Sequence, residues 1–139
     1  MSDTKDTRVG RREFVGVTAA AAGITILKPS LVFGTQANSA VRLGLLGCGG
    51  RGLGVTSGFV KNTGAVVTAV ADLFADNLEA GKKRLDEAAA AAGKPAIDAG
   101  HAFKGLNAFD ALFNSKDVDA VYIASPPWFH PAHGEAALA

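Results

Sequence analysis

The chain has 139 residues, of which 48% are hydrophobic and 19% are charged, and its formal net charge is +1. These values are typical of a globular chain of roughly one domain, and they argue against nucleic acid as a partner because phosphate binding usually leaves a clear basic excess. One cysteine and three histidines exclude an internal disulfide and argue against a metal site, so we predict neither.

Residues 1–40 differ in composition from the rest of the chain. A polar stretch with four basic residues, 1–14, precedes thirteen uncharged residues, 15–27, and a small-residue segment follows at 36–40. A charged start, a short apolar stretch and small residues, in this order, form the layout of an export signal. The apolar stretch is shorter than the ~20 residues that span a bilayer.

An arginine pair lies within this segment, at the start of Arg11-Arg12-Glu13-Phe14-Val15. The pattern resembles the bacterial twin-arginine signal, with Gly10 as a departure from its commonest form. We therefore predict a signal peptide over 1–40, export by the twin-arginine machinery, and a periplasmic or otherwise exported location. The alternatives are a disordered basic tail with a chance arginine pair and an uncleaved membrane tether.

The first strand and the loop after it carry the strongest chemical signal. The apolar run 41–46 predicts a strand buried on both faces of a parallel sheet, and 51–62 is predicted to be a helix. Between them, GCGGRG has the spacing G-x-G-x-x-G, in which the glycines permit a tight turn, close approach of a pyrophosphate, and helix–strand contact. Backbone N–H groups at the helix start would then face the anion, although a plain turn is the alternative. The predicted cofactor-binding residues of this loop are Gly47, Cys48, Gly49, Gly50, Arg51 and Gly52.

A second strand is predicted over 65–71, which is apolar and β-branched and ends at Asp72. Asp72 lies twenty residues after Gly52, where a carboxylate accepts hydrogen bonds from an adenosine ribose. The alternative is a solvated strand end. A carboxylate here would repel a 2′-phosphate, and Leu73 offers no positive charge, so the sequence favours NAD over NADP.

The rest of the chain continues the alternation of strands and helices. Phe74, Leu78 and Leu85 have the spacing of one apolar helix face, and Asn107 with Asp110 resembles a capping box at a helix start. The remaining predicted elements are helix 74–93, strand 101–105, helix 108–114, a buried strand 120–124 and a final helix that Pro131 opens.

Strands alternating with helices at this spacing predict an α/β fold with a Rossmann-like parallel sheet. Only the first βαβαβ half of such a sheet is predicted, because the sequence stops within its last predicted helix. The loops after the strands, 47–52, 72–73 and 125–127, would line the ligand crevice. We therefore predict a Rossmann domain that binds NAD(P) over residues 41–139.

Three segments together resemble the glucose–fructose oxidoreductase, inositol dehydrogenase and rhizopine-catabolism (Gfo/Idh/MocA) family. They are VRLGLLGCGGRG (41–52), AVADLF (69–74) and DVDAVYIASPPWFHPAHGEAAL (117–138). The resemblance implies that the glycine loop and Asp72 hold the cofactor. A histidine five residues after the serine is usual in the family, but some exported members have it eight residues on, which matches His133. The residues that the resemblance places near the cofactor are Ser125, Pro126, Pro127 and His130.

The resemblance also implies a function. We expect the dinucleotide-binding part of an exported NAD(P)-dependent oxidoreductase that acts on a sugar or polyol hydroxyl. The alternatives are an NAD-dependent glycoside hydrolase that oxidises the sugar transiently, and a non-catalytic nucleotide-binding fragment. Family members continue with a catalytic lysine and a C-terminal substrate domain, which this sequence lacks. We therefore expect a truncated chain without turnover of its own and assign no catalytic residue; the sequence does not indicate the oligomeric state.

Overall fold

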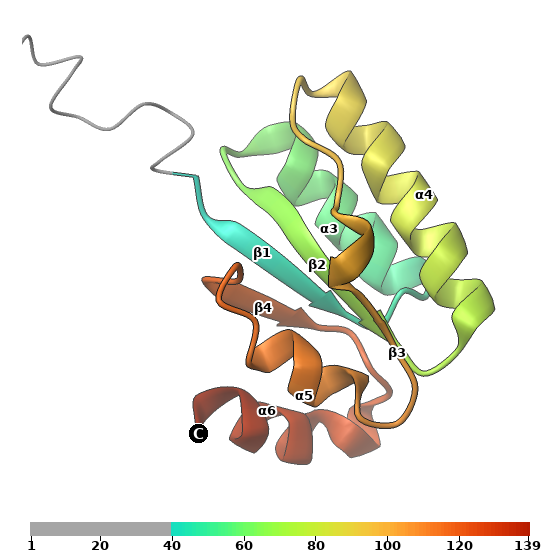
Figure 1. Ribbon diagram of the computed structural model, residues 1–139, viewed down its shortest axis with the longest axis vertical. Coiled ribbons are helices and arrows are strands. Elements are labelled where there is room, and N and C mark those ends of the chain that lie inside the picture. The colour runs from blue at the N-terminus through green and yellow to red at the C-terminus, as the bar shows by residue number, and fades with distance from the viewer. Residues whose placement is uncertain (1–39) are drawn as a thin grey trace, which may run out of the picture. The chain divides into compact units, whose positions relative to one another are not determined.

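The computed structural model describes residues 40–139, which form a parallel sheet with helices on both faces (Figure 1). Apart from Ala40, the predicted signal peptide lies outside the described residues. All strand pairs are parallel and the order is β3-β2-β1-β4, which confirms the predicted Rossmann-like α/β class. The strands are β1 (Arg42–Leu46), β2 (Val66–Asp72), β3 (Ala102–Lys104) and β4 (Ala120–Ile123).

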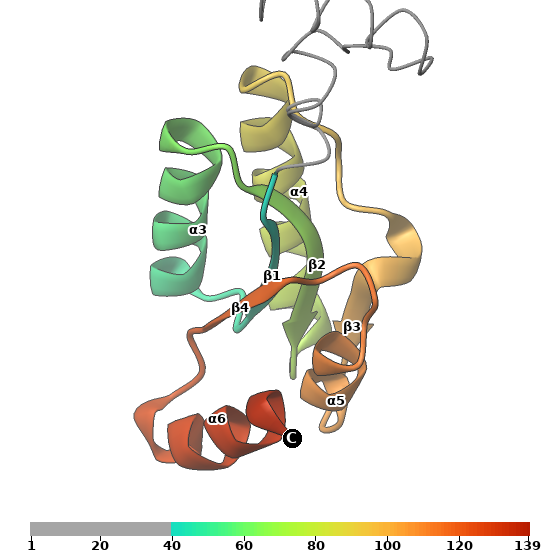
Figure 2. The same cartoon turned by 90° about the vertical axis from the view of Figure 1, so that its left-hand side faces the viewer.

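Four helices cover the sheet, and their bounds differ from the predicted ones by a few residues at most. Helices α3 and α4 pack on one face and α5 packs on the other (Figure 2), while α6 lies against α5 and β4. None of the helices between residues 40 and 139 is long and apolar enough to cross a bilayer. The helices are α3 (Gly50–Asn62), α4 (Ala75–Ala91), α5 (Ala108–Phe113) and α6 (His130–Leu138), with 3₁₀ turns at Ala99–His101 and Pro127–Phe129.

The two central strands are buried on both faces, as their apolar runs predicted. Leu45 and Val70 belong to the core that α3 and α4 cover, whereas Leu46 and Ala71 belong to the core under α5. Neighbouring side chains of a strand thus enter opposite cores, as the strand period of two requires. Strand β4 is only partly buried, contrary to the prediction, because in the described part of the chain it pairs with β1 alone.

Two local predictions about helix starts are wrong. Phe74 was expected on the buried face of its helix, but it precedes α4 with an extended backbone and is 62% exposed. Asn107 occupies the N-cap position of α5, yet its side chain makes no capping hydrogen bond. Instead, the N–H of Asp110 donates to the backbone carbonyl of Asn107 at 3.1 Å, so the first turn is closed by the main chain.

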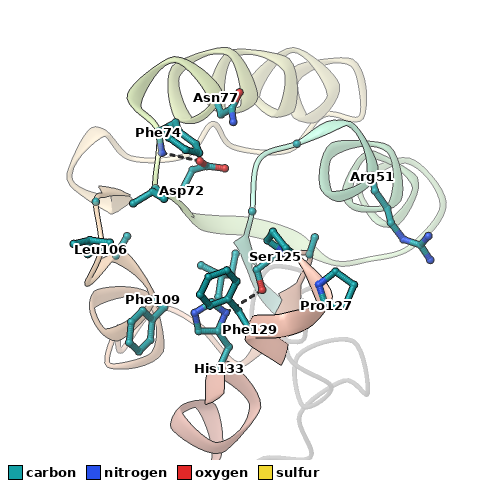
Figure 3. A pocket seen from close by; sticks show the side chains of 18 residues that line it. Arg51, Asp72, Phe74, Asn77, Leu106, Phe109, Ser125, Pro127, Phe129 and His133 are labelled. Carbon is teal, nitrogen blue, oxygen red and sulfur yellow. Dashed lines mark hydrogen bonds between the residues drawn. The ribbon is translucent and has the colours of Figure 1, made fainter. Parts of the chain in front are cut away.

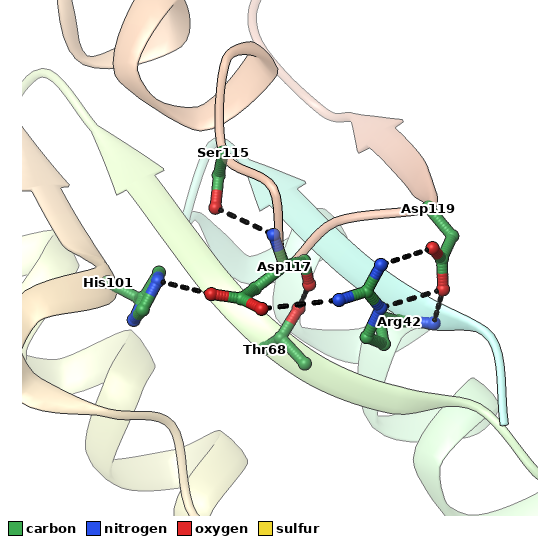
Figure 4. A network of polar contacts seen from close by, with 6 residues as sticks. All are labelled: Arg42, Thr68, His101, Ser115, Asp117 and Asp119. Atoms are coloured by element: carbon green, nitrogen blue, oxygen red, sulfur yellow. Dashed lines mark hydrogen bonds and ion pairs between the residues drawn. The ribbon is translucent and has the colours of Figure 1, made fainter. Parts of the chain in front are cut away.

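A polar network ties the strands together at the ends opposite the glycine loop (Figure 4). The guanidinium of Arg42, on β1, donates to Asp119 at 2.7 Å and to Asp117 at 3.2 Å. The hydrogen bonds that Asp119 accepts from the side chain and the main-chain N–H of Arg42 lower the pKa of Asp119 to about 2. Thr68 on β2 donates to the carbonyl oxygen of Asp117, whose carboxylate also lies 3.2 Å from His101. The network holds β4 beside β1 and leaves the carboxyl ends of the strands open.

Candidate cofactor-binding site

A cavity of about 540 Å³ lies at the carboxyl ends of the strands (Figure 3). It spans the junction of β1 with β4, where the strand order reverses, and such a switch point is where open α/β sheets bind ligands. All three loops predicted to form the crevice contribute to its wall. The predicted site residues that line it are Gly47, Gly49, Arg51, Asp72, Ser125, Pro126 and Pro127.

Gly47 and Gly52 are required by the fold itself. Gly47 has a φ of +98°, and a Cβ there would lie 2.8 Å from the main chain of Ala124. A Cβ at Gly52 would overlap the carbonyl oxygen of Gly47. These are the tight turn and the close helix–strand contact that the glycine spacing predicts. Gly52 does not line the cavity; its lack of a side chain lets α3 pack closely against the main chain of Gly47.

Gly49 is different, because nothing in the described protein needs a glycine there. Its φ is negative, and a Cβ built on it meets no atom within 4 Å, yet the residue lines the cavity. Gly49 is also the N-cap of α3, where no side chain caps the helix and the first turn holds no acidic residue. The unsatisfied N–H groups of a helix start attract anions, so this arrangement fits a phosphate group in close contact with the main chain.

Asp72 is a buried carboxylate at the end of β2, with an exposed fraction of 7%. One oxygen accepts a hydrogen bond from the N–H of Cys48 at 2.7 Å, and the other accepts one from the N–H of Phe74 at 2.8 Å. Asp72 therefore joins the glycine loop to the start of α4. A carboxylate offers about four acceptor positions, so positions for a ligand hydroxyl are left on the side that lines the cavity.

The side chain of Cys48 points away from the cavity, which corrects its assignment as a cofactor contact. It is 3% exposed and packs on α4, where a Cβ at Gly81 would lie 2.7 Å from the Cβ of Cys48. Only the main-chain N–H of Cys48 serves the site, through Asp72. Burial, and secondarily the negative charge of Asp72, raise the pKa of the Cys48 thiol to about 12.

We expect the Cys48 thiol to be unreactive in the folded chain. A pKa of about 12, together with burial, makes its modification at pH 8 slower than in urea by on the order of 10³-fold, because the thiolate is the reacting form. Cys48 is the chain's single cysteine. The absorbance of the coloured product that a chromogenic disulfide reagent releases therefore reports on Cys48 alone. Equal rates with and without urea would contradict the buried position.

Two further loop residues that were predicted to bind the cofactor lie at the rim of the cavity or outside its lining. Gly50 is exposed and lies outside the cavity lining, because the first turn of α3 directs it away from the sheet. Arg51 lines the rim, but Figure 3 shows its side chain extending away from Asp72 and Ser125. Its guanidinium makes no ion pair among residues 40–139.

The segment after β4 brings His133, and not His130, to the cavity. The ring N–H of His130 donates to the carbonyl oxygen of Ser125 at 2.7 Å, and the His130 side chain is exposed and outside the lining. Because α6 begins at His130, the residue three positions on, His133, turns to the cavity side. Nδ1 of His133 lies 2.9 Å from the hydroxyl oxygen of Ser125.

The imidazole of His133 packs against two aromatic rings at this wall (Figure 3). The ring of Phe129 stacks on it with 5.7 Å between centroids, and the ring of Phe109, from α5, lies 4.9 Å away. Burial, and secondarily the positive charge of His130, lower the pKa of His133. The side chain is therefore a neutral imidazole at neutral pH.

Sequence reasoning missed several residues of the wall because they come from helices and from the loop after β3. Apolar spacing assigns Phe109 to a helix without indicating that its ring contacts His133. The sequence around His130 and His133 likewise does not indicate which of the two histidines faces the cavity. No three His, Cys, Asp or Glu side chains in residues 40–139 are close enough to form a metal site. The missed lining residues include Phe74, Asn77, Leu106, Phe109 and Phe129, whereas His133 was the open alternative to His130.

No protein-family model matches the chain, but the chain is similar to several curated proteins. Over 102 residues it is 37% identical to a glycosyl hydrolase family 109 protein of Streptomyces coelicolor, a match that covers 73% of this chain and 20% of the relative. Its curated relatives are glycosyl hydrolase family 109 proteins. Another, glycosyl hydrolase family 109 protein 2 of Shewanella sp. (strain ANA-3), is 40% identical over 100 residues, which is 71% of this chain and 21% of that protein.

A family 109 protein of Stenotrophomonas maltophilia matches more of the chain, with 32% identity over 130 residues, or 92% of the chain and 27% of the relative. The chain thus spans about a fifth to a quarter of the length of its family 109 relatives. Among solved structures, it resembles scyllo-inositol dehydrogenase from Lactobacillus casei, solved with NAD(H) and scyllo-inositol. That match has a TM-score of 0.51 and 24% identity, covers 72% of this chain and 25% of the other, and supports the fold assignment alone.

Proposed function

We propose that residues 41–139 are the NAD-binding part of a Gfo/Idh/MocA-type protein related to glycosyl hydrolase family 109. One observation carries the proposal: Gly49 leaves an open space against the uncapped start of α3, inside the cavity at the switch point of the sheet. A bulky anion that contacts the main chain explains why the loop has no side chain there. The family 109 relatives and the predicted family resemblance support this assignment.

The cofactor would be bound by residues of three loops. The pyrophosphate fits the loop at Gly49, and the adenosine ribose fits beside Asp72, whose remaining acceptor positions suit two hydroxyl groups. The fixed, buried charge of Asp72 disfavours a 2′-phosphate, so we assign NAD over NADP. Bound NAD supplies a hydride acceptor, while this chain binds and orients it.

The names of the relatives favour hydrolysis among the activities considered. The curated relatives are called glycosyl hydrolases, which supports an NAD-dependent glycoside hydrolase that oxidises and re-reduces one sugar. An oxidoreductase acting on a sugar or polyol hydroxyl is the second candidate, favoured by the predicted family resemblance. In either case, the catalytic lysine and the substrate domain are assigned to parts of the longer relatives that these residues do not match.

We further propose that the protein is exported by the twin-arginine machinery to the periplasm, on the basis of Arg11, Arg12 and the layout of residues 1–40. That route carries folded proteins, so NAD can be bound before export. A reaction that regenerates NAD in each cycle would then need no fresh cofactor outside the cytoplasm. Replacing Arg11 and Arg12 with lysine should move the protein from the periplasmic to the cytoplasmic fraction. Unchanged fractionation would contradict the proposal.

Calorimetric titration of the 139-residue chain with NAD, NADP and ADP-ribose tests the binding function. We expect one saturable site for NAD and for ADP-ribose, and NADP binding weaker by roughly tenfold or more, because a 2′-phosphate meets the charge of Asp72. A folded chain that binds neither NAD nor ADP-ribose would overturn the proposal. A chromogenic glycoside assay on a family 109 relative then separates hydrolysis from net oxidation.

A further inference from the structure

The pair formed by Ser125 and His133 lies at the wall of the cavity beside β4 (Figure 3), whereas the adenosine ribose is assigned to Asp72 at the end of β2. We infer that His133 donates a hydrogen bond to an uncharged oxygen on the nicotinamide half of the bound cofactor, and that Ser125 positions its ring for this contact. The inference rests on the proposed NAD-binding function and adds a recognition residue to it.

The first step of the argument is the direction of the ligand. Asp72 ends β2, so an adenosine ribose at Asp72 lies on the β2 side of the switch point, and the other half of a dinucleotide extends over the end of β4. The segment that follows β4 lines the cavity there. Within this segment, Ser125 and His133 are the only polar side chains of the lining, because its other members are alanine, prolines and Phe129.

The second step concerns the protons of the pair. Among the described residues, the Ser125 hydroxyl has one partner, Nδ1 of His133, at 2.9 Å. If the neutral imidazole carries its proton on Nε2, Nδ1 accepts the hydroxyl proton and the serine is satisfied; with the proton on Nδ1, the hydroxyl proton has no acceptor in the described protein. We therefore assign the proton of the neutral ring to Nε2, which is then a donor with no acceptor among residues 40–139.

The third step is the orientation of the ring. Phe129 stacks on the imidazole at an interplanar angle of 17°, and Phe109 packs near it from α5. Together with the hydrogen bond to Ser125, these contacts fix the plane of the ring before any ligand binds. A fixed neutral donor suits an uncharged acceptor such as a carboxamide oxygen.

The test uses the 139-residue chain and compares NAD with ADP-ribose, which lacks the nicotinamide ring. We expect His133→Phe to weaken NAD binding about five- to tenfold, the effect of one lost hydrogen bond, and to change ADP-ribose binding less than twofold. His133→Gln should retain most of the affinity for NAD, because the glutamine amide nitrogen reaches the position of Nε2. His101→Phe, on the opposite ends of the strands, is the matched control and should leave both affinities unchanged.

Ser125 is tested as a positioning residue. Ser125→Ala should reproduce the selective loss of NAD affinity, and Ser125→Thr should restore it, because threonine keeps the hydroxyl. Equal losses for NAD and ADP-ribose in His133→Phe, or no loss for either, would overturn the inference while leaving the proposed function intact. A selective loss in His130→Phe but not in His133→Phe would also overturn it. A wild-type chain that binds neither ligand would instead refute the proposed function.

Discussion

Replacing Gly52 with alanine is expected to destabilise the folded chain by about 3 kcal/mol, more than any surface substitution. The added methyl group would overlap the carbonyl oxygen of Gly47, and it would also lie 3.1 Å from the Cβ of Ala124. The main chain of a tight turn cannot move aside as a flexible side chain can, so α3 must shift away from the sheet. Urea denaturation monitored by circular dichroism should show a lower midpoint with an unchanged slope.

Gly54→Ala is the matched control for this prediction, because Gly54 belongs to the same helix. A Cβ at Gly54 meets no atom within 4 Å, and the residue is exposed. Alanine in an exposed helix interior should therefore raise the free energy of unfolding by about 0.5–1 kcal/mol. If Gly52→Ala were as stable as Gly54→Ala, the described contact between α3 and the glycine loop would be incorrect.

Replacing Gly49 with alanine is expected to lower the affinity for NAD by on the order of 10- to 100-fold, with little change in stability. The backbone of Gly49 is extended with a negative φ, and its Cβ would meet no protein atom within 4 Å, so the fold tolerates a side chain there. The methyl group would occupy the space that the proposed pyrophosphate needs against the main chain. Calorimetric titration measures the affinity, and urea denaturation checks the fold.

Gly50→Ala is the control that distinguishes a loss of space for the ligand from a loss of flexibility in the glycine loop. Gly50 is the neighbouring glycine, its Cβ also meets nothing within 4 Å, and it does not line the cavity. We expect its affinity for NAD to stay within about twofold of the wild-type value. Equal losses in the two variants would mean that flexibility of the loop, and not space at Gly49, governs binding.

Most of the fold was predictable because strands and helices differ in the period of their apolar residues. The runs that became β1 and β2 are buried on both sides, and each is followed by a helix, which restricts the pairing to a parallel sheet. The burial of β4 was not predictable in this way. An apolar run looks the same at the edge of a sheet and in its middle, and within residues 40–139 β4 pairs with β1 alone.

The candidate site was predictable at the glycine loop and at Asp72, where the chemistry depends on neighbours along the chain. It was less predictable after β4, where His130 and His133 differ by less than one helical turn. The structure separates them through the position at which α6 begins and through the contact of Phe109 with His133. Asp72 also has a second role, holding the N–H of Cys48, which no spacing along the chain indicates.

By itself, the amino-acid sequence determined the parallel α/β class, the glycine loop and the carboxylate at the end of β2, because local backbone geometry and strand periodicity are properties of short segments. Only the tertiary structure decided which glycine is required by the fold and which faces the cavity, since Gly52 meets Gly47 while Gly49 meets open space. It also decided that His133 reaches the cavity. Both outcomes depend on contacts between segments whose distance in space is set by packing, and packing is not a property of either segment alone.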